Sequence, residues 1–120
     1  MTYSETKFRN LLDKRYKGAL IVKFPDFKAG AILSSGYPDY LVIHDGNHLW
    51  FEVKTTPSKY TFNFNLIEDS QWRVFKMMLN NDIDVNLAVY TSDWTLHMLK
   101  FSDILKLQTA EICVLTLQKR

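Results

Sequence analysis

The dipeptide Asp45-Gly46, set between two runs rich in apolar and aromatic residues, constrains the fold of this chain more than any other feature. An Asp-Gly pair in this setting is a strong signal for a two-residue β-hairpin loop. With that loop, His44 pairs with Asn47, and counting outward along both strands sets Asp39 opposite Glu52. Directly opposed residues share one face of a sheet, with Cβ atoms about 5 Å apart. The hairpin therefore predicts two carboxylates side by side at its open end.

Two carboxylates this close repel each other, and burial raises the pKa of one of them unless a cation intervenes. The pair therefore predicts a metal site. Hard oxygen ligands favour Mg²⁺ or Mn²⁺ over zinc, and Mg²⁺ typically uses one or two carboxylates and keeps several waters. Lys54 lies two residues beyond Glu52, so on a strand its side chain points to the same face. There its ammonium is placed to orient or help deprotonate an attacking water, or to stabilise charge on a phosphoryl oxygen.

A purely structural interpretation competes with this one, because Glu-x-Lys is common on strands and an Asp after Pro often only begins a strand. The surrounding residues favour function, since both faces of the hairpin are otherwise apolar. The carboxylate face carries Leu41, Ile43 and Trp50, and the other face carries Val42, Leu49, Phe51 and Val53. Charges on a strand buried on both sides are costly unless they are paired or bind a metal. A three-residue loop would instead shift the pairing of the two strands by one residue. Asp39 and Glu52 would then lie on opposite faces of the sheet.

The segment from Gly36 to Gln71 resembles the PD-(D/E)XK nuclease superfamily, with Pro38-Asp39 as the first half of its motif and Glu52-Val53-Lys54 as the second. Within the superfamily it is most similar to RecU-type Holliday junction resolvases, through an Asp-Tyr start, a Gly-containing hairpin and Phe-Glu-x-Lys-x-Thr. Its Gly-x-Pro-Asp also resembles the VRR-type nucleases and archaeal resolvases. Part of Lys23 to Tyr37 is the segment available for the stalk that RecU-type enzymes insert into a four-way junction.

The resemblance implies that Asp39, Glu52 and the main-chain carbonyl of Val53 bind a divalent ion, Mg²⁺ or Mn²⁺. Lys54 and Gln71, the latter on the following helix, complete the implied site. The implied fold is a restriction-endonuclease-like core, an α/β domain with a mixed central β-sheet flanked by α-helices. The order of elements along the chain agrees with such a sheet, whereas the handedness and the strand order come from the resemblance alone.

Composition agrees with a single compact domain over residues 1–120, since 47% of the residues are hydrophobic and 14% aromatic. The net charge is only +2, but residues 1–30 hold seven Lys or Arg against three acids. We see neither a secretory signal nor a run close to the roughly 18 apolar residues that span a bilayer, so we expect a cytoplasmic protein. The sole cysteine, Cys113, is expected to be a buried strand residue.

Hydrophobic periodicity predicts the remaining elements. Thr2-x-x-Glu5 is a capping box that opens a first helix, which ends before Gly18. The other expected elements are strands over 19–24, 85–91, 95–101 and 112–117, a helix over about 69–80, a helical turn over 101–107, and an irregular connection or short strand over 25–36.

Gln71 shares the apolar stripe of the predicted second helix with Val74, Phe75 and Met78. From the residues alone, this position favours an amide at the edge of the core that bonds a backbone group. The resemblance favours a role in holding a water or contacting the scissile phosphate. Glu5 is a candidate auxiliary acid, because the superfamily often adds an acid from its first helix, although the capping box already accounts for it.

Two further groups of residues are candidates for DNA contact. Lys59, Tyr60 and Phe62 form either a surface where rings stack on bases or wedge a junction open, or an edge strand with alternating core residues. Both alternatives stay open. The candidates for phosphate contacts on the first helix, each of which also fits a solvated helix face, are Lys7, Arg9, Lys14, Arg15 and Lys17.

We therefore predict a divalent-metal-dependent endonuclease that hydrolyses a DNA phosphodiester by in-line attack of a metal-bound water. The resemblance implies 5′-phosphate and 3′-hydroxyl ends, and a four-way junction as the first substrate to test, in recombination or repair. A homodimer is expected because resolvases cut two symmetry-related strands. The alternatives are a VRR-type or restriction-type nuclease, or a non-catalytic nucleic-acid-binding module on the same fold.

Overall fold

The computed structural model describes residues 2–24 and 36–117. Its helices are α1 (Tyr3–Arg15), α2 (Asp69–Asn80) and α3 (Phe101–Thr109), with a 3₁₀ turn at Phe64–Leu66. Its strands are β1 (Leu20–Lys23), β2 (Tyr40–His44), β3 (Asn47–Thr55), β4 (Thr61–Asn63), β5 (Asn86–Tyr90), β6 (Leu96–Lys100) and β7 (Val114–Thr116). The connection or short strand expected over 25–36, and with it most of the segment available for a stalk, lies outside the described residues apart from Gly36.

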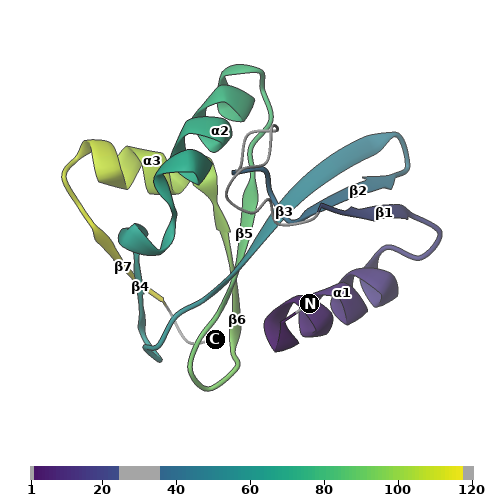
Figure 1. Ribbon diagram of the computed structural model, residues 1–120, viewed down its shortest axis with the longest axis horizontal. Coiled ribbons are helices and arrows are strands. Elements are labelled where there is room, and N and C mark those ends of the chain that lie inside the picture. Colours follow the sequence, from purple (N-terminus) through teal and green to yellow (C-terminus); the bar gives the residue numbers. More distant parts are fainter. Residues whose placement is uncertain (1, 25–35, 118–120) are drawn as a thin grey trace, which may run out of the picture.

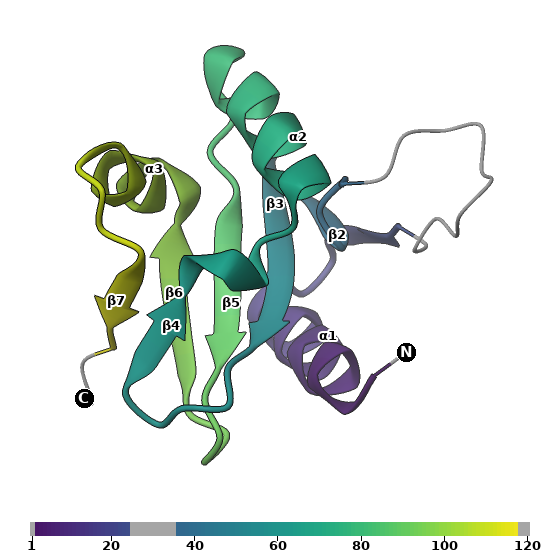
Figure 2. The same cartoon turned by 60° about the vertical axis from the view of Figure 1, so that its left-hand side comes forward.

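A mixed five-stranded sheet in the order β1-β2-β3-β5-β6 organises the fold. Strands β3 and β5 are parallel, and the other neighbours in this sheet are antiparallel. Helix α1 covers one face of the sheet, while α2 and α3 lie on the other, beside the small β4–β7 sheet (Figures 1 and 2). The expected α/β architecture with a central mixed sheet flanked by helices is confirmed.

The hairpin forms with the two-residue loop expected from its sequence. Asp45 and Gly46 have φ of 50° and 78°, and a positive φ at both central residues marks a type I′ turn. His44 pairs with Asn47, and Tyr40 pairs with Phe51. The three-residue alternative is therefore excluded.

The faces of β3 divide its residues between two cores. Phe51 and Val53 pack with Phe8 of α1 in one cluster, whereas Glu52 and Lys54 point toward α2. The expectation that the hairpin is buried on both faces was wrong at its tip. There Ile43 is 42% exposed, and together with Trp50 it lines an open groove of about 350 Å³. No helix of the described chain covers this part of the carboxylate face, so only the base of the hairpin is enclosed.

The C-terminal part departs most from expectation. Helix α3 runs two residues further than the helical turn predicted over 101–107. The last strand is shorter than the predicted 112–117, and Cys113 lies just before it. The cysteine was expected to be buried and is exposed, since β7 pairs with the short β4 at the surface of the molecule. None of the helices in the described ranges is long and apolar enough to cross a membrane.

Candidate active site

Glu52, Lys54 and Gln71 form a closed ring of contacts between β3 and α2. Gln71 Nε2 donates to Glu52 Oε2 at 2.9 Å, and Lys54 Nζ donates to Gln71 Oε1 at 2.6 Å. Lys54 Nζ also lies 3.6 Å from Glu52 Oε2. The amide therefore fixes the carboxylate and the ammonium relative to each other, and its contacts are with these side chains as well as with a backbone group.

The first turn of α2 explains why Gln71 reaches the strand. Glu68 is the N-cap residue of α2, and its backbone N–H donates to Gln71 Oε1 at 3.1 Å in a capping box. The amide oxygen thus bonds both Lys54 and the helix start. The expected bounds of this helix are confirmed, and the apolar stripe of Gln71 faces the sheet.

Gly36 brings the motif segment against the same helix turn. Its φ is +105°, which favours glycine, and a Cβ built on it would lie 2.4 Å from the Ser70 carbonyl oxygen. Only glycine fits this approach without displacement of the backbone. The close contact carries the following residues, Tyr37 to Asp39, toward the base of the hairpin.

Asp39 is buried just outside the first residue of β2. Its Oδ2 accepts a hydrogen bond of 2.8 Å from the N–H of Val53. When the β2–β3 register is continued, Pro38 stands opposite Val53, and proline has no N–H to offer the Val53 carbonyl. Because N–H and C=O of one strand residue point the same way, that carbonyl is directed toward the Asp39 side. The role of this carbonyl as a metal ligand stays a prediction.

Sequence reasoning missed one member of this cluster, Lys23. Its Nζ lies 3.7 Å from Asp39 Oδ1, donates to the Phe24 carbonyl at 2.8 Å, and sits 5.4 Å from the centre of the Tyr40 ring. It comes from β1, where Lys23 pairs with Tyr40. The available signal was a lysine that ends an otherwise apolar strand.

Electrostatics single out Glu52. Burial raises its pKa to about 8, the Asp39 charge adds to this rise, and Lys54 and Gln71 oppose it. Its Oε1 is buried and has no hydrogen-bond partner among the described residues. Burial, helped by the charges of Glu5 and Asp39, also raises the pKa of Tyr40 to about 12. The site therefore disfavours its own negative charge and offers a buried oxygen to a cation.

A divalent ion fits these residues. Glu52 Oε1 is an unpartnered buried acceptor, Asp39 lies beside it, and the donors are hard oxygen atoms of the kind that Mg²⁺ and Mn²⁺ prefer. No group of three or more His, Cys, Asp or Glu side chains suited to a metal occurs in residues 2–24 and 36–117. The protein ligands on offer are thus two carboxylates and the Val53 carbonyl, which suits an ion that keeps several waters.

Glu5 has other partners in α1. Its carboxylate accepts from the Thr2 N–H at 3.3 Å in the predicted capping box, and its backbone carbonyl accepts from the Tyr40 hydroxyl at 3.2 Å. It does not join Asp39 and Glu52 in a group of three acids within the described ranges. The structure therefore supports the capping role that the sequence already explained.

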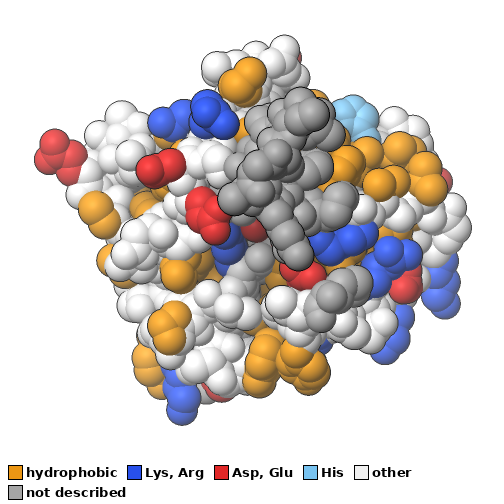
Figure 3. All heavy atoms as spheres, viewed as in Figure 1, with side chains coloured by type: hydrophobic (Ala, Val, Ile, Leu, Met, Phe, Trp, Pro, Cys, Tyr) orange, Lys and Arg blue, Asp and Glu red, His pale blue; other side chains and the backbone are white. Residues whose placement is uncertain are grey.

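Helix α1, to which most of the basic candidates belong, lies on the side of the sheet away from α2 (Figure 1). Arg9 pairs with Asp13 at 3.2 Å, and Lys14 and Arg15 occupy the last turn, where cations stabilise a helix. In the view of Figure 3, Lys and Arg side chains gather over α1 and the neighbouring end of β1. The remaining candidates on this side of the molecule, both exposed, are Lys7 and Lys17.

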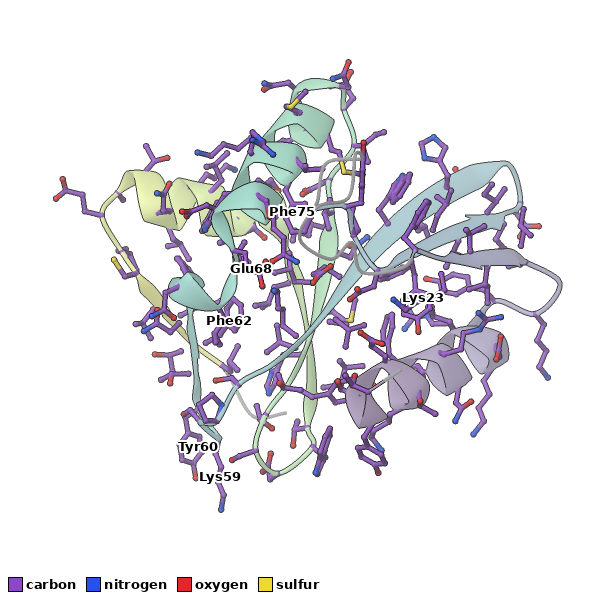
Figure 4. All side chains as sticks on the ribbon, viewed as in Figure 1. Lys23, Lys59, Tyr60, Phe62, Glu68 and Phe75 are labelled. Atoms are coloured by element: carbon purple, nitrogen blue, oxygen red, sulfur yellow. The ribbon has the colours of Figure 1, made fainter. Side chains whose placement is uncertain are left out.

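The three candidates for DNA contact in and before β4 differ in their exposure. Lys59 and Tyr60 are exposed and extend away from the body of the protein (Figure 4). Phe62 is fully buried and packs against Phe64, so at this residue the edge-strand alternative is confirmed and contact with DNA is excluded. Side chains alternate along β4, and this puts Phe62 into the core.

No protein-family model matches the chain, and no curated protein sequence matches it. Among solved structures, it is similar to Hjc of Archaeoglobus fulgidus, a Holliday junction resolvase from an archaeal hyperthermophile. The TM-score is 0.53 at 12% sequence identity, and the match covers 84% of this chain and 75% of the Hjc chain. RecU-type specificity stays a prediction. The chain has the restriction-endonuclease-like fold of a resolvase.

Proposed function

We propose that this protein is a divalent-metal-dependent endonuclease that hydrolyses DNA phosphodiesters, with branched DNA as its substrate. One observation carries the proposal. A buried carboxylate oxygen, Glu52 Oε1, has no hydrogen-bond partner among the described residues, while its carboxyl group lies close to that of Asp39. Such an arrangement is costly in a resting protein and favourable once a cation binds.

Asp39, Glu52 and the Val53 carbonyl would hold the ion, which is Mg²⁺ or Mn²⁺. When bound there, a divalent ion would polarise a phosphoryl oxygen and lower the pKa of water. The ring of contacts between Glu52, Lys54 and Gln71 orders the side chains before substrate arrives. This order matters because catalysis by charge requires groups that are already in place.

Lys54 acts on the attacking water. Its ammonium, fixed by Gln71 Oε1, orients the water and stabilises the negative charge that builds on the phosphoryl oxygens. The water oxygen bonds to phosphorus and loses a proton, and the bond from phosphorus to O3′ breaks as O3′ gains one. The products are a 5′-phosphate and a 3′-hydroxyl. Gln71 is a positioning residue in this scheme, since it acts through Lys54 and Glu52.

The substrate class rests on the resolvase neighbour and on exposed cationic and aromatic side chains elsewhere on the protein. We propose a four-way junction in recombination or repair, cut by a homodimer so that two symmetry-related strands are cleaved. Lys59 and Tyr60 supply a cation and a ring on an exposed loop, a combination that suits the backbone and an unstacked base. The basic residues of α1 add non-specific attraction to phosphates.

Cleavage assays test the proposal. A labelled four-way junction, a flap and a linear duplex of the same sequences are incubated with Mg²⁺, with Mn²⁺ and with a chelator, using Glu52→Gln protein as the control. We expect cutting of the junction that needs the ion and is lost in the variant. Equal cutting of all three DNAs removes the resolvase assignment and keeps the nuclease. Binding without any cutting favours the non-catalytic module.

A further inference from the structure

We propose that Lys23 is a second catalytic lysine, which contacts the scissile phosphate and weakens metal binding at Asp39. This inference rests on the proposed nuclease function. It goes beyond the expected motif, which contains only Lys54. Lys23 reaches the site from β1, on a part of the sheet that the motif does not include.

The contacts of Lys23 hold the ammonium in place and leave donors to spare. Its hydrogen bond to the Phe24 carbonyl and its position near the Tyr40 ring both come from the strands beside it. An ammonium has three N–H donors, and the described chain gives this one a single hydrogen bond. The Asp39 oxygen at 3.7 Å is an ion-pair partner beyond hydrogen-bond distance. The remaining donors are therefore available to phosphate oxygens.

Lys23 is placed relative to Asp39 much as Lys54 is placed relative to Glu52. Each lysine lies near one carboxylate of the pair, at 3.7 Å from Asp39 and 3.6 Å from Glu52. Both side chains are largely buried, at 22% and 13% exposed. In Figure 4, Lys23 and the α2 start at Glu68 flank the base of the hairpin from two sides. A phosphate at the carboxylate pair would thus meet a cation on each side.

Lys23 adds one positive charge to the net formal charge of the site. Asp39 and Glu52 together cancel the charges of Lys23 and Lys54, so the side chains sum to zero. With a divalent ion the site then carries two positive charges. A phosphodiester holds one negative charge, and it gains another when the attacking water gives up its proton. The site that includes Lys23 therefore matches the charge of the transition state better than that of the bound substrate, which is the condition for catalysis.

The same lysine has the opposite effect on the metal. A cation beside Asp39 repels a second cation and competes for the same carboxylate, so its removal should strengthen metal binding. If the Lys23–Asp39 ion pair only stabilises the fold, its loss should have a different effect on metal binding. Its removal would take the lysine away from buried Asp39, lower the melting temperature with and without metal, and weaken binding of the ion.

The test compares Lys23→Met, Lys23→Arg and a control, Lys106→Met, an exposed lysine on α3. We measure Mn²⁺ affinity by titration calorimetry without DNA, the melting temperature, and kcat and KM on the four-way junction. For Lys23→Met we expect Mn²⁺ to bind roughly three-fold to thirty-fold tighter, and kcat to fall roughly 100-fold with a smaller change in KM. Lys23→Arg should recover part of kcat, and the control should match the wild type.

Weaker Mn²⁺ binding in Lys23→Met, or an unchanged kcat, would overturn the assignment. If the methionine variant does not fold, Lys23→Gln takes its place in the same measurements. A wild-type protein that binds Mn²⁺ and cuts DNA, with a Lys23→Met variant that does both equally well, refutes only this inference. A wild-type protein that neither binds the ion nor cuts DNA refutes the proposed function, and this inference with it.

Discussion

The Glu52 side and the Asp39 side of the site are built alike but are neutralised to different degrees. Both oxygens of Asp39 have contacts, one with the Val53 N–H and one with Lys23. Glu52 places both of its partners on Oε2 and leaves Oε1 buried with none in the described chain. Burial, together with the Asp39 charge, raises the Glu52 pKa to about 8. The difference teaches that the electrostatic cost of the metal-free site is concentrated on Glu52, where a bound cation gains most.

The largest expected effects come from removing each carboxylate in turn. Asp39→Asn and Glu52→Gln should both lower turnover on cleavable DNA by roughly 1000-fold or more, because each removes a proposed metal ligand. Their effects on the metal-free protein should differ in sign. Glu52→Gln should raise the free energy of unfolding by about 1–3 kcal/mol, and Asp39→Asn should lower it by a similar amount. Urea unfolding with a chelator, beside the cleavage assay, measures both.

A change of the same sign in the free energy of unfolding of the two variants would contradict the proposed difference between Asp39 and Glu52. A loss of stability in Glu52→Gln would mean that the charge of Glu52 is well compensated without metal. Thermal shifts give a second measurement, since added Mn²⁺ should raise the melting temperature of the wild type and of neither variant.

Gly36→Ala should disrupt the contact between the segment that leads to Asp39 and helix α2, which carries Gln71 on the Glu52 side. A Cβ at this position lies 2.4 Å from the Ser70 carbonyl oxygen, and the φ of +105° adds strain. We expect about 3 kcal/mol of lost stability, with cleavage reduced at temperatures where the variant is still folded. Gly18→Ala is the matched control, since its φ is +82° and a Cβ there meets nothing within 4 Å. If both variants lose the same stability, backbone strain alone accounts for the effect and the α2 contact does not.

The metal-free protein should lose stability as the pH rises. The Glu52 pKa lies at about 8 in the folded state against 4.5 for an ordinary Glu, so the folded state binds the proton more tightly. The resulting stabilisation is complete below pH 4.5 and is lost as the pH rises through about 8. Urea unfolding across this range, with a chelator present, should show the decline in the wild type and a flatter course in Glu52→Gln. A wild type as flat as the variant would mean that Glu52 titrates normally.

The local part of the site could be predicted from the sequence. The Asp45-Gly46 loop fixed the register of β2 and β3, and with the register came the neighbourhood of Asp39 and Glu52. Lys54 followed from strand alternation, because two residues along a strand return to the same face. These relations depend on short separations in the chain and on rules of backbone geometry that hold in any hairpin.

The parts that depend on distant packing could not be predicted. Lys23 joins the site through the pairing of β1 with β2, which brings together segments that are separated by a long connection. The sequence left the burial of Phe62 undecided, and the expected burial of Cys113 was wrong, because each depends on what β4 and β7 meet in three dimensions. Alternation predicts which residues share a face, but not which face is covered.

The smallest expected effect is that of Gln71→Ala, which disturbs the Glu52 side alone. The variant removes a hydrogen bond to Glu52 and another to Lys54, while all three proposed metal ligands and both lysines remain. We expect kcat to fall roughly ten-fold to 100-fold, because the catalytic groups are present but less well ordered. The Glu52 pKa should rise further, since Gln71 lowers it in the wild type, so the pH at which metal binding becomes tight should move upward. Gln108→Ala on α3 serves as the control for an exposed glutamine. An unchanged pH dependence of Mn²⁺ binding in Gln71→Ala would show that the amide has no part in preparing Glu52 for the ion.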